Sequence, residues 1–221
     1  MDLFRLERIT KIYNPYFKAL DITTFNIKEG EFLLLTGPTG AGKTTLLKLL
    51  YREEKPTEGE IFYKNLPYSK LNRSKFSEFR RNWGIIFQDY KLILDLTVFE
   101  NIQISLYLSS KKVPKPKLYI LNYLERFNLA PKAFKKVKEL SGGEQQKVGI
   151  IRAIIRDPEL LIADEPTGNL DPESVKETIK LFKEYQQAGK TIILATHDPL
   201  ILQLNPGRTI RLEMGRLVEN V

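Results

Sequence analysis

The sequence predicts an α/β fold, and three features carry that prediction. A short apolar run, residues 31–36, leads through a glycine-rich loop into a helix-forming segment at residues 45–50. Two further apolar runs, residues 160–163 and 191–195, end in polar residues, as buried strands of an open sheet do. Between residues 97 and 139 only helical periodicity is present, so we expect a helical subdomain inserted into the α/β core.

Composition sets the broad class of the protein. A chain of 221 residues with 42% hydrophobic side chains is long enough for one large domain, or for a core with a subdomain. The absence of cysteine excludes disulfides, thiolate chemistry and cysteine-based zinc sites, and it fits a reducing cytoplasm. The charged N-terminus and the lack of any apolar run near the ~20 residues of a membrane span predict a soluble chain.

The net charge of +8 allows nucleic acid, anionic lipid headgroups or an acidic protein as a partner. The densest positive patches are residues 111–112, 115–117 and 132–138. Aromatic residues are not regularly interleaved with these patches, as a base-stacking surface would require. We therefore interpret the patches as solvated faces and expect no nucleic-acid partner, and we keep an anionic membrane surface as an alternative.

The N-terminal part predicts strands at residues 3–9 and 25–27, the second followed by a turn at residues 28–30. Between them an Asn-Pro pair predicts a loop over residues 12–15. An exposed Tyr13 in that loop could stack on an adenine ring, or it could be an ordinary half-buried aromatic residue. The sequence alone leaves both interpretations open.

Residues 37–44 fit the phosphate-binding pattern G-x-x-x-x-G-K-[ST]. Its glycines let successive backbone N–H groups point at a phosphate chain, and the following helix directs its positive dipole end at the same anion. Lys43 would reach the β- and γ-phosphates, and the Thr44 hydroxyl could bind Mg²⁺. The alternative is a plain glycine-rich turn, but the flanking strand and helix favour nucleotide binding.

The next segment predicts a turn at residues 56–59, a strand at 60–63, a helix at 71–81 and a buried strand at 84–87. Gln88 follows that strand at the edge where ligands gather in open α/β sheets. It could contact Mg²⁺ or a water molecule, although as an isolated residue it neither favours nor opposes such a role.

Thr97 can cap a helix that carries Val98, Ile102 and Leu106, and a loop over residues 111–117 then precedes another helix ending near residue 127. Ser141 and Glu144 have the spacing of a capping box, with two glycines between them. This segment predicts either a simple capped helix or a second anion-binding site, and the physical arguments favour the two interpretations equally.

Asp164 and Glu165 come at the end of a predicted buried strand. Two adjacent carboxylates at such a place cost folding free energy unless they have a partner. Asp164 is placed to hold Mg²⁺ directly or through water, and Glu165 could polarise the attacking water. His197, the only histidine, follows another such strand and could donate a hydrogen bond to the γ-phosphate, although a lone histidine is more often structural. Residues 208–212 and 215–218 predict a closing hairpin.

Together these elements resemble the ATP-binding cassette (ABC) ATPases over essentially the whole chain. Residues 140–145 look like the family signature, the most specific element, and residues 169–171 look like the D-loop. The resemblance implies nucleotide contacts for an aromatic residue, the Walker A loop, the Q-loop and the signature: Tyr13, Gly37, Pro38, Thr39, Gly40, Ala41, Gly42, Lys43, Thr44, Thr45, Gln88, Ser141, Gly142 and Gly143. It implies Mg²⁺ ligands at Thr44, Gln88 and Asp164, and catalytic roles for Glu165, His197 and Lys43.

The family also implies one ABC domain with a P-loop NTPase core, an antiparallel β-subdomain and an inserted α-helical subdomain. We expect the core at residues 1–88 and 150–221, and the helical subdomain at 89–149, ending in the signature. An active ATPase that uses ATP and Mg²⁺ is implied. Two chains would pair head to tail as an ATP-bound homodimer, with each ATP between the Walker A loop of one chain and the signature of the other.

Residues 163–171 are similar to the group that contains lipoprotein-release, macrolide-export and cell-division cassettes, and residues 36–43, 87–92 and 96–101 look most like its cell-division branch, the FtsE type. This implies a peripheral position on the cytoplasmic face of the cell membrane, an FtsX-like integral membrane partner and control of cell-wall hydrolases. The alternative is the ATPase subunit of a transporter of the lipoprotein-release or macrolide-export type. Nucleic-acid-linked relatives with long coiled coils do not fit, because only a short helical stretch lies between residues 89 and 139.

Overall fold

The computed structural model describes residues 1–108 and 113–219. Its strands are β1 Asp2–Asn14, β2 Phe17–Lys28, β3 Phe32–Thr36, β4 Glu58–Tyr63, β5 Leu66–Pro67, β6 Trp83–Ile86, β7 Leu160–Asp164, β8 Thr191–Ala195, β9 Arg208–Glu213 and β10 Arg216–Glu219. Its α-helices are α1 Lys43–Leu50, α2 Arg73–Arg81, α3 Val98–Tyr107, α4 Pro116–Arg126, α5 Gly142–Ile154, α6 Pro172–Gln187 and α7 Pro199–Leu204. Three short 3₁₀ helices are η1 Tyr68–Lys70, η2 Ala130–Lys132 and η3 Val137–Glu139.

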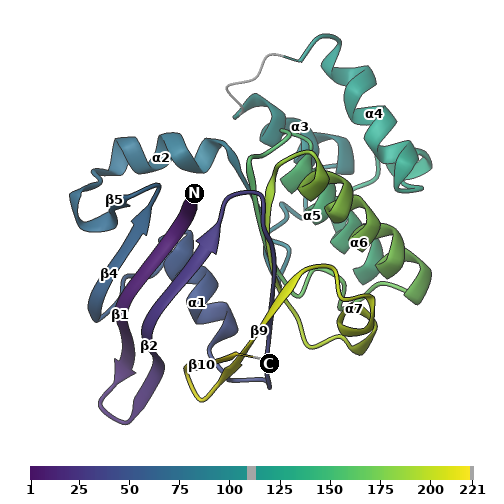
Figure 1. Cartoon of the computed structure of the whole chain (residues 1–221). Helices are drawn as coiled ribbons and strands as arrows, with labels where there is room; N and C mark the ends of the chain where they lie inside the picture. The colour runs from purple at the N-terminus through teal and green to yellow at the C-terminus, as the bar shows by residue number, and fades with distance from the viewer. Residues whose placement is uncertain (109–112, 220–221) are drawn as a thin grey trace.

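The strands form two sheets. A six-stranded sheet has the order β10-β9-β3-β8-β7-β6 and is parallel except for the β9–β10 hairpin, and a four-stranded antiparallel sheet has the order β2-β1-β4-β5. The antiparallel sheet and α2 lie at one side of the molecule, α1 lies in the middle, and α3 to α6 lie at the other side (Figure 1). The expected α/β core, antiparallel β-subdomain and helical subdomain are all present.

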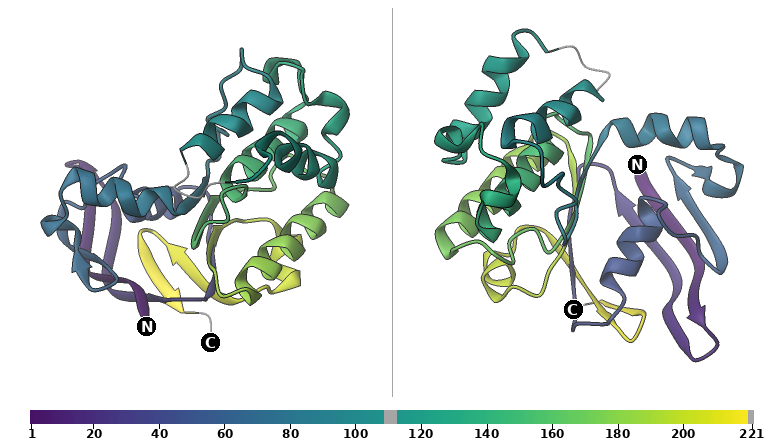
Figure 2. Two further views of the ribbon diagram at one scale, coloured as in Figure 1. Left: turned by 90° about the horizontal axis from the view of Figure 1, so that it is seen from above. Right: turned by 180° about the vertical axis from the view of Figure 1, so that it is seen from behind.

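The central strands of the six-stranded sheet are buried on both faces. Every residue of β3, β7 and β8 is buried, which explains why these segments are continuous apolar runs without alternation. Leu33 and Leu35 pack toward α1 and the antiparallel sheet, whereas Leu34 packs toward α5, α6 and α7. The two cores therefore lie on opposite faces of one sheet, as the view from above also indicates (Figure 2).

The predicted loop over residues 12–15 is wrong for residues 12–14, which belong to β1. Ile12 pairs with Lys18 and Asn14 pairs with Phe17, with register irregularities along this end of the hairpin. Residues 12–14 continue the pairing with β2, and the Ile12 N–H donates to the Thr57 hydroxyl at 3.0 Å, so the local Asn-Pro signal acts only at the turn that follows.

The helical subdomain has its own apolar cluster, formed chiefly by α3, α4 and the 3₁₀ segments. Thr97 caps α3, as predicted, and Glu100 completes a capping box with it. The predicted loop over residues 111–117 is too long, because α4 begins at Pro116, where the missing N–H costs nothing. Residues 111–112, part of that loop and of a predicted basic patch, lie outside the described residues.

Helix α5 belongs to both parts of the molecule. Val148 and Ile151 join the cluster of the helical subdomain, while Ile150 and Ile154 join the core under the parallel sheet. The expected boundary at residues 149–150 therefore passes through this helix. Among the described residues, no helix combines the length and the apolar composition that crossing a bilayer requires.

An aromatic cluster joins the two sheets, and Trp83 lies at its centre. The Trp83 ring is fully buried and lies 5.0 Å from Tyr63, 5.6 Å from Phe76 and 5.9 Å from Phe4, measured between ring centroids. Its indole N–H donates to the Tyr63 hydroxyl at 3.2 Å. Trp83 thus connects the start of β6 to the antiparallel sheet.

Because large buried rings leave cavities when truncated, Trp83→Ala should lower the free energy of unfolding by about 3–5 kcal/mol. Tyr16→Ala is the control, since Tyr16 is 98% exposed, and it should change the value by less than about 0.5 kcal/mol. Urea denaturation followed by circular dichroism measures both. Equal stability of the two variants would contradict the central place of Trp83.

Candidate functional site

The phosphate-binding loop connects β3 to α1 and packs tightly against two other strands. Gly37 and Gly42 have positive φ angles of 138° and 104°. A β-carbon at Gly37 would lie 2.1 Å from the carbonyl oxygen of Leu212, and one at Gly42 would lie 2.6 Å from that of Ala19. Both positions therefore require glycine for backbone conformation and for space.

The Lys43 side chain lies over this loop. It is only 8% exposed, and its ammonium donates to the carbonyl oxygens of Gly37 at 2.8 Å and Pro38 at 3.2 Å. These two bonds solvate a charge that burial would otherwise penalise. The loop and the N-terminus of α1 thus concentrate positive potential at one place.

Asp164 ends β7 next to Thr44. It is buried, and its Oδ1 has no hydrogen-bond partner among the described residues. Burial raises the pKa of Asp164, while the neighbouring Thr44 hydroxyl opposes that rise. An orphaned carboxylate oxygen beside a hydroxyl fits Mg²⁺, which takes few protein ligands and keeps water or phosphate oxygens. The described residues contain no cluster of three or more metal-binding His, Cys, Asp or Glu side chains.

Glu165 has a backbone conformation that side chains rarely adopt, with φ at 47°. Its amide N–H donates to the carbonyl oxygen of Ala195 at 2.9 Å. The carboxylate accepts from the Thr196 hydroxyl at 3.0 Å and from Nδ1–H of His197 at 2.6 Å. Because a carboxylate only accepts, Nδ1 of His197 carries the proton in this contact. Three consecutive residues at the end of β8 and directly after it, Ala195, Thr196 and His197, therefore hold Glu165 in place.

These groups surround one cavity of about 210 Å³ at the carboxyl edge of the parallel sheet. The predicted site residues that line it come from the loop, from α1 and from the ends of three strands: Thr39, Gly40, Gly42, Lys43, Thr44, Thr45, Gln88, Asp164, Glu165 and His197. Residues distant in sequence thus converge where ligands bind in α/β proteins.

Phe17 also lines the cavity, although sequence reasoning did not single it out. Tyr13, which was singled out, is absent from the lining and stacks on Phe17 with ring centroids 6.2 Å apart and planes 16° apart. The hairpin register brings these rings together, because Phe17 pairs with Asn14. An adenine platform at this edge would therefore involve both aromatic residues.

The signature residues lie outside the cavity lining of their own chain. Ser141 is the N-cap of α5, and Ser141 and Glu144 form the predicted capping box. Ser141 and Gly142 are exposed. The capped helix is therefore present, and its N-terminus remains accessible from solvent.

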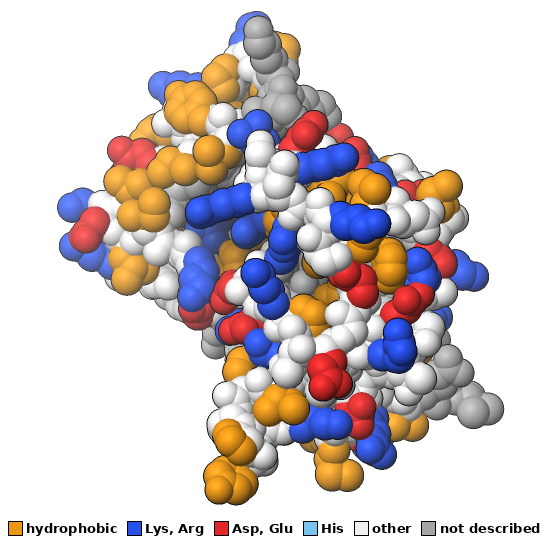
Figure 3. Space-filling model, turned by 90° about the vertical axis from the view of Figure 1, so that its left-hand side faces the viewer, with side chains coloured by type: hydrophobic (Ala, Val, Ile, Leu, Met, Phe, Trp, Pro, Cys, Tyr) orange, Lys and Arg blue, Asp and Glu red, His pale blue; other side chains and the backbone are white. Residues whose placement is uncertain are grey.

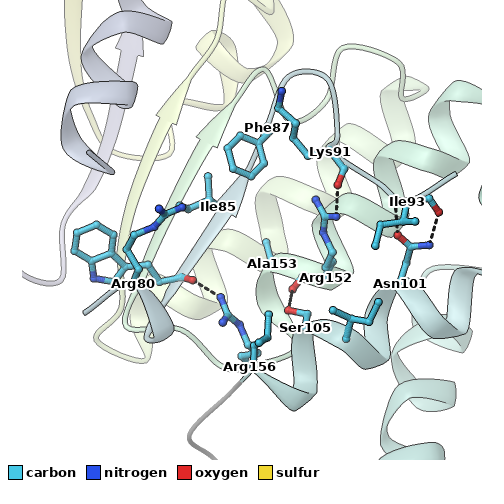
Figure 4. Close-up of a pocket in the computed structure, with 13 residues that line it drawn as sticks. Arg80, Ile85, Phe87, Lys91, Ile93, Asn101, Ser105, Arg152, Ala153 and Arg156 are labelled. Carbon is cyan, nitrogen blue, oxygen red and sulfur yellow. Dashed lines mark hydrogen bonds between the residues drawn. The ribbon is translucent and has the colours of Figure 1, made fainter. Parts of the chain in front are cut away.

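A second cavity, of about 340 Å³, lies between β6 and helices α2, α3 and α5. Its cationic residues are Arg80, Lys91, Arg152 and Arg156, and its described lining contains no acidic residue. Arg152 donates to the backbone carbonyls of Tyr90 and Lys91. Figure 4 shows the bond to Lys91 and the bond that Arg156 donates to the Trp83 carbonyl at 2.6 Å. We call this cavity the basic groove.

Exposed apolar side chains line or border the groove: Ile93, Ile104 and Leu108 belong to its lining, and Leu94 and Tyr107 are their exposed neighbours in the chain. Ile93 and Leu94 follow the Gln88 segment, and Ile104, Tyr107 and Leu108 belong to α3 or its end. On the face shown in Figure 3, Lys and Arg side chains cross the middle, and hydrophobic side chains gather above them. The lining and border of the groove therefore combine positive charge with unburied apolar area.

Comparison with known proteins agrees with this geometry. The sequence model of the family described as "ABC transporter" matches residues 20–168. The Cell division ATP-binding protein FtsE of Bacillus subtilis (strain 168) is 38% identical over 218 residues, which are 99% of this chain and 96% of the relative. FtsE of Escherichia coli (strain K12) is 38% identical over 97% of both chains, and FtsE of Mycobacterium tuberculosis is 37% identical over 99% of this chain and 95% of the relative.

Solved structures give the same result. The dimeric ATP-binding cassette MJ0796 bound to ADP and Pi has a TM-score of 0.87 and 33% identity, and the match covers 97% of this chain and 96% of that one. The cassette cbiO1 from Clostridium perfringens has a TM-score of 0.80 and 31% identity over 98% and 87% of the two chains. The chain therefore belongs to the ABC transporter family, as an ATP-hydrolysing cassette similar in sequence to the FtsE proteins.

Proposed function

We propose that this cassette is the ATPase subunit of a membrane-associated complex of the FtsE type, acting in cell division. The convergence of Lys43, Asp164, Glu165 and His197 on one cavity supports ATP turnover. Identities of 36–38% to FtsE proteins along nearly the whole chain support the cell-division branch.

Each cavity residue has a role that its position supports. Lys43 and the loop N–H groups bind the β- and γ-phosphates, and Thr44, Gln88 and Asp164 hold Mg²⁺. When bound, Mg²⁺ neutralises charge on those phosphates. Glu165 accepts a proton from the attacking water. His197, oriented by Glu165, donates from Nε2 to the γ-phosphate when its ring carries both protons.

The active form is a head-to-tail homodimer with two composite sites. Ser141, Gly142 and Gly143 lie at an accessible helix N-terminus outside their own cavity, which suits contact with the nucleotide of a second chain. Tyr13 and Phe17 hold the adenine ring at the opposite end of the phosphate chain. The dimeric form of the MJ0796 cassette supports this arrangement.

The membrane partner is an FtsX-like integral membrane protein whose cytoplasmic segment enters the basic groove. Cations line the groove and exposed apolar residues flank it, so the complementary segment is apolar and carries acidic side chains. The groove shares Phe87 with the strand end that leads into Gln88, so the nucleotide site and the partner contact one segment. The cassette then sits peripherally on the cytoplasmic face of the membrane, and its ATP cycle controls cell-wall hydrolases through the partner.

Glu165→Gln should retain ATP binding and lower turnover at least about 100-fold, because the amide cannot accept a proton from water. Phosphate release measures turnover, and light scattering with ATP should detect accumulation of the dimer. The matched control is Glu125→Gln on the exposed face of α4, which should keep wild-type turnover. Turnover of Glu165→Gln within twofold of the wild type would refute the role of Glu165.

Asp164→Asn should weaken the effect of Mg²⁺ on ATP binding about tenfold or more, since it removes the charged ligand. The measurement is the thermal shift produced by ATP as a function of Mg²⁺ concentration, which does not depend on turnover. An unchanged Mg²⁺ dependence would remove Asp164 from the metal site.

Arg80→Glu should lower co-purification of the membrane partner at least tenfold, because it reverses a charge at the groove. Arg73→Glu is the control, since Arg73 lies on the same helix away from the groove lining. The assay captures Glu165→Gln chains carrying each change from crosslinked native membranes with ATP.

Equal capture by the two charge variants would contradict docking in the groove. A captured four-span membrane protein with a large extracytoplasmic loop, together with septal proteins, supports the division role. A permease of an exporter or of a lipoprotein-release system would replace that role with transport.

A further inference from the structure

The side chain of Gln146 bridges the signature helix and the segment that follows β7. Gln146 lies on α5, near the signature end of the helix, and is 1% exposed. Its Nε2 donates to the carbonyl oxygen of Glu165 at 3.1 Å, and its Oε1 accepts from the N–H of Asn169 at 2.7 Å. Both polar atoms of a buried amide are thus used on backbone groups of the segment after β7.

The bond to Glu165 acts on a strained peptide. Glu165 has a φ of 47° and precedes a proline, a combination that an unrestrained chain seldom adopts. Its N–H is held by the Ala195 carbonyl, and its own carbonyl is held by Gln146. The direction of the Glu165 carboxylate therefore depends on both of these bonds.

The bond to Asn169 fixes the other side of the same turn. The carbonyl of Asn169 lies against the signature, because a β-carbon at Gly143 would come within 2.7 Å of it. The Asn169 side-chain amide also donates to the hydroxyl of Tyr90, which follows the Gln88 segment. Gln146 therefore stands where the signature helix, the Glu165 turn and the Gln88 segment meet.

We propose that Gln146 is a positioning residue that locks Glu165 and the backbone of residue 169 to the signature helix. This inference rests on the proposed composite sites. There, Ser141 to Gly143 contact the partner chain's nucleotide while Glu165 acts on its own. Gln146 then makes the alignment of Glu165 at one site depend on how α5 engages the other.

The first test is Gln146→Met, which keeps the length of the side chain and removes both hydrogen bonds. We expect kcat for ATP hydrolysis to fall at least tenfold, with KM for ATP changed less than threefold. The control is Gln186→Met, because Gln186 also donates to a backbone carbonyl, that of Gly30, at 2.8 Å. It should keep the wild-type kcat. An unchanged kcat for Gln146→Met, or equal losses in both variants, would overturn the proposal.

The second test uses mixed dimers of one Gln146→Met chain and one Glu165→Gln chain. If Gln146 positions Glu165 of its own chain, neither site is intact, and turnover falls to no more than that of the Gln146→Met dimer. If Gln146 instead acted through the signature on the partner's nucleotide, one site would be intact. Turnover would then stay near half of the wild-type value, and the proposal would fail.

A second variant guards against loss of folding. Gln146→Asn keeps a neutral amide and shortens the side chain by one methylene, so that it cannot reach both Glu165 and Asn169. It should show the same selective loss of kcat as Gln146→Met. The proposed function is judged separately by Glu165→Gln: if that variant is inactive while both Gln146 variants turn over normally, the ATPase site stands and only the role of Gln146 falls.

Discussion

The parallel pairing of β3, β8 and β7 is the constraint on which the rest of the structure depends. Leu35 and Asp164 both pair with Ala195, so the three chains leave the sheet side by side. Because these strands are buried along their whole length, polar side chains that need solvent or a ligand gather beyond that edge. The phosphate-binding loop, Glu165 and His197 meet there although they are distant in sequence.

Electrostatics explains why this edge is suited to a phosphate ligand with a divalent cation. Lys43 is a buried ammonium that donates hydrogen bonds to two loop carbonyls, and Asp164 is a buried carboxyl whose pKa is raised by burial. The Asp164 Oδ1 atom has no hydrogen-bond partner among the described residues. Each group alone is a cost to folding. Magnesium-bound phosphates would satisfy both groups, so the features that weaken the fold locally are those that favour the ligand.

Helix α5 connects the parts of the molecule that must act together. Its N-terminus carries the exposed signature, its side chains enter two separate cores, and Arg152 holds the backbone of Tyr90 and Lys91 beside the basic groove. Gln146, one turn after Ser141, reaches the Glu165 turn. A displacement of α5 would therefore act on Glu165, on the segment after Gln88 and on the groove together, because close-packed elements move as units.

The sequence by itself determined the features whose signals are local: the glycine spacing of residues 37–44, the helix caps at Thr97 and Ser141 and the apolar runs that become buried strands. It failed at residues 12–14, where pairing with β2 outweighs a local loop signal. Only the tertiary structure revealed that Phe17 lines the cavity, that Gln146 contacts the Glu165 turn and that the basic groove exists. Gln146 bonds to backbone groups 19 and 23 positions away. No short pattern encodes such contacts, because the free energy that holds them comes from packing between segments rather than from propensities within one.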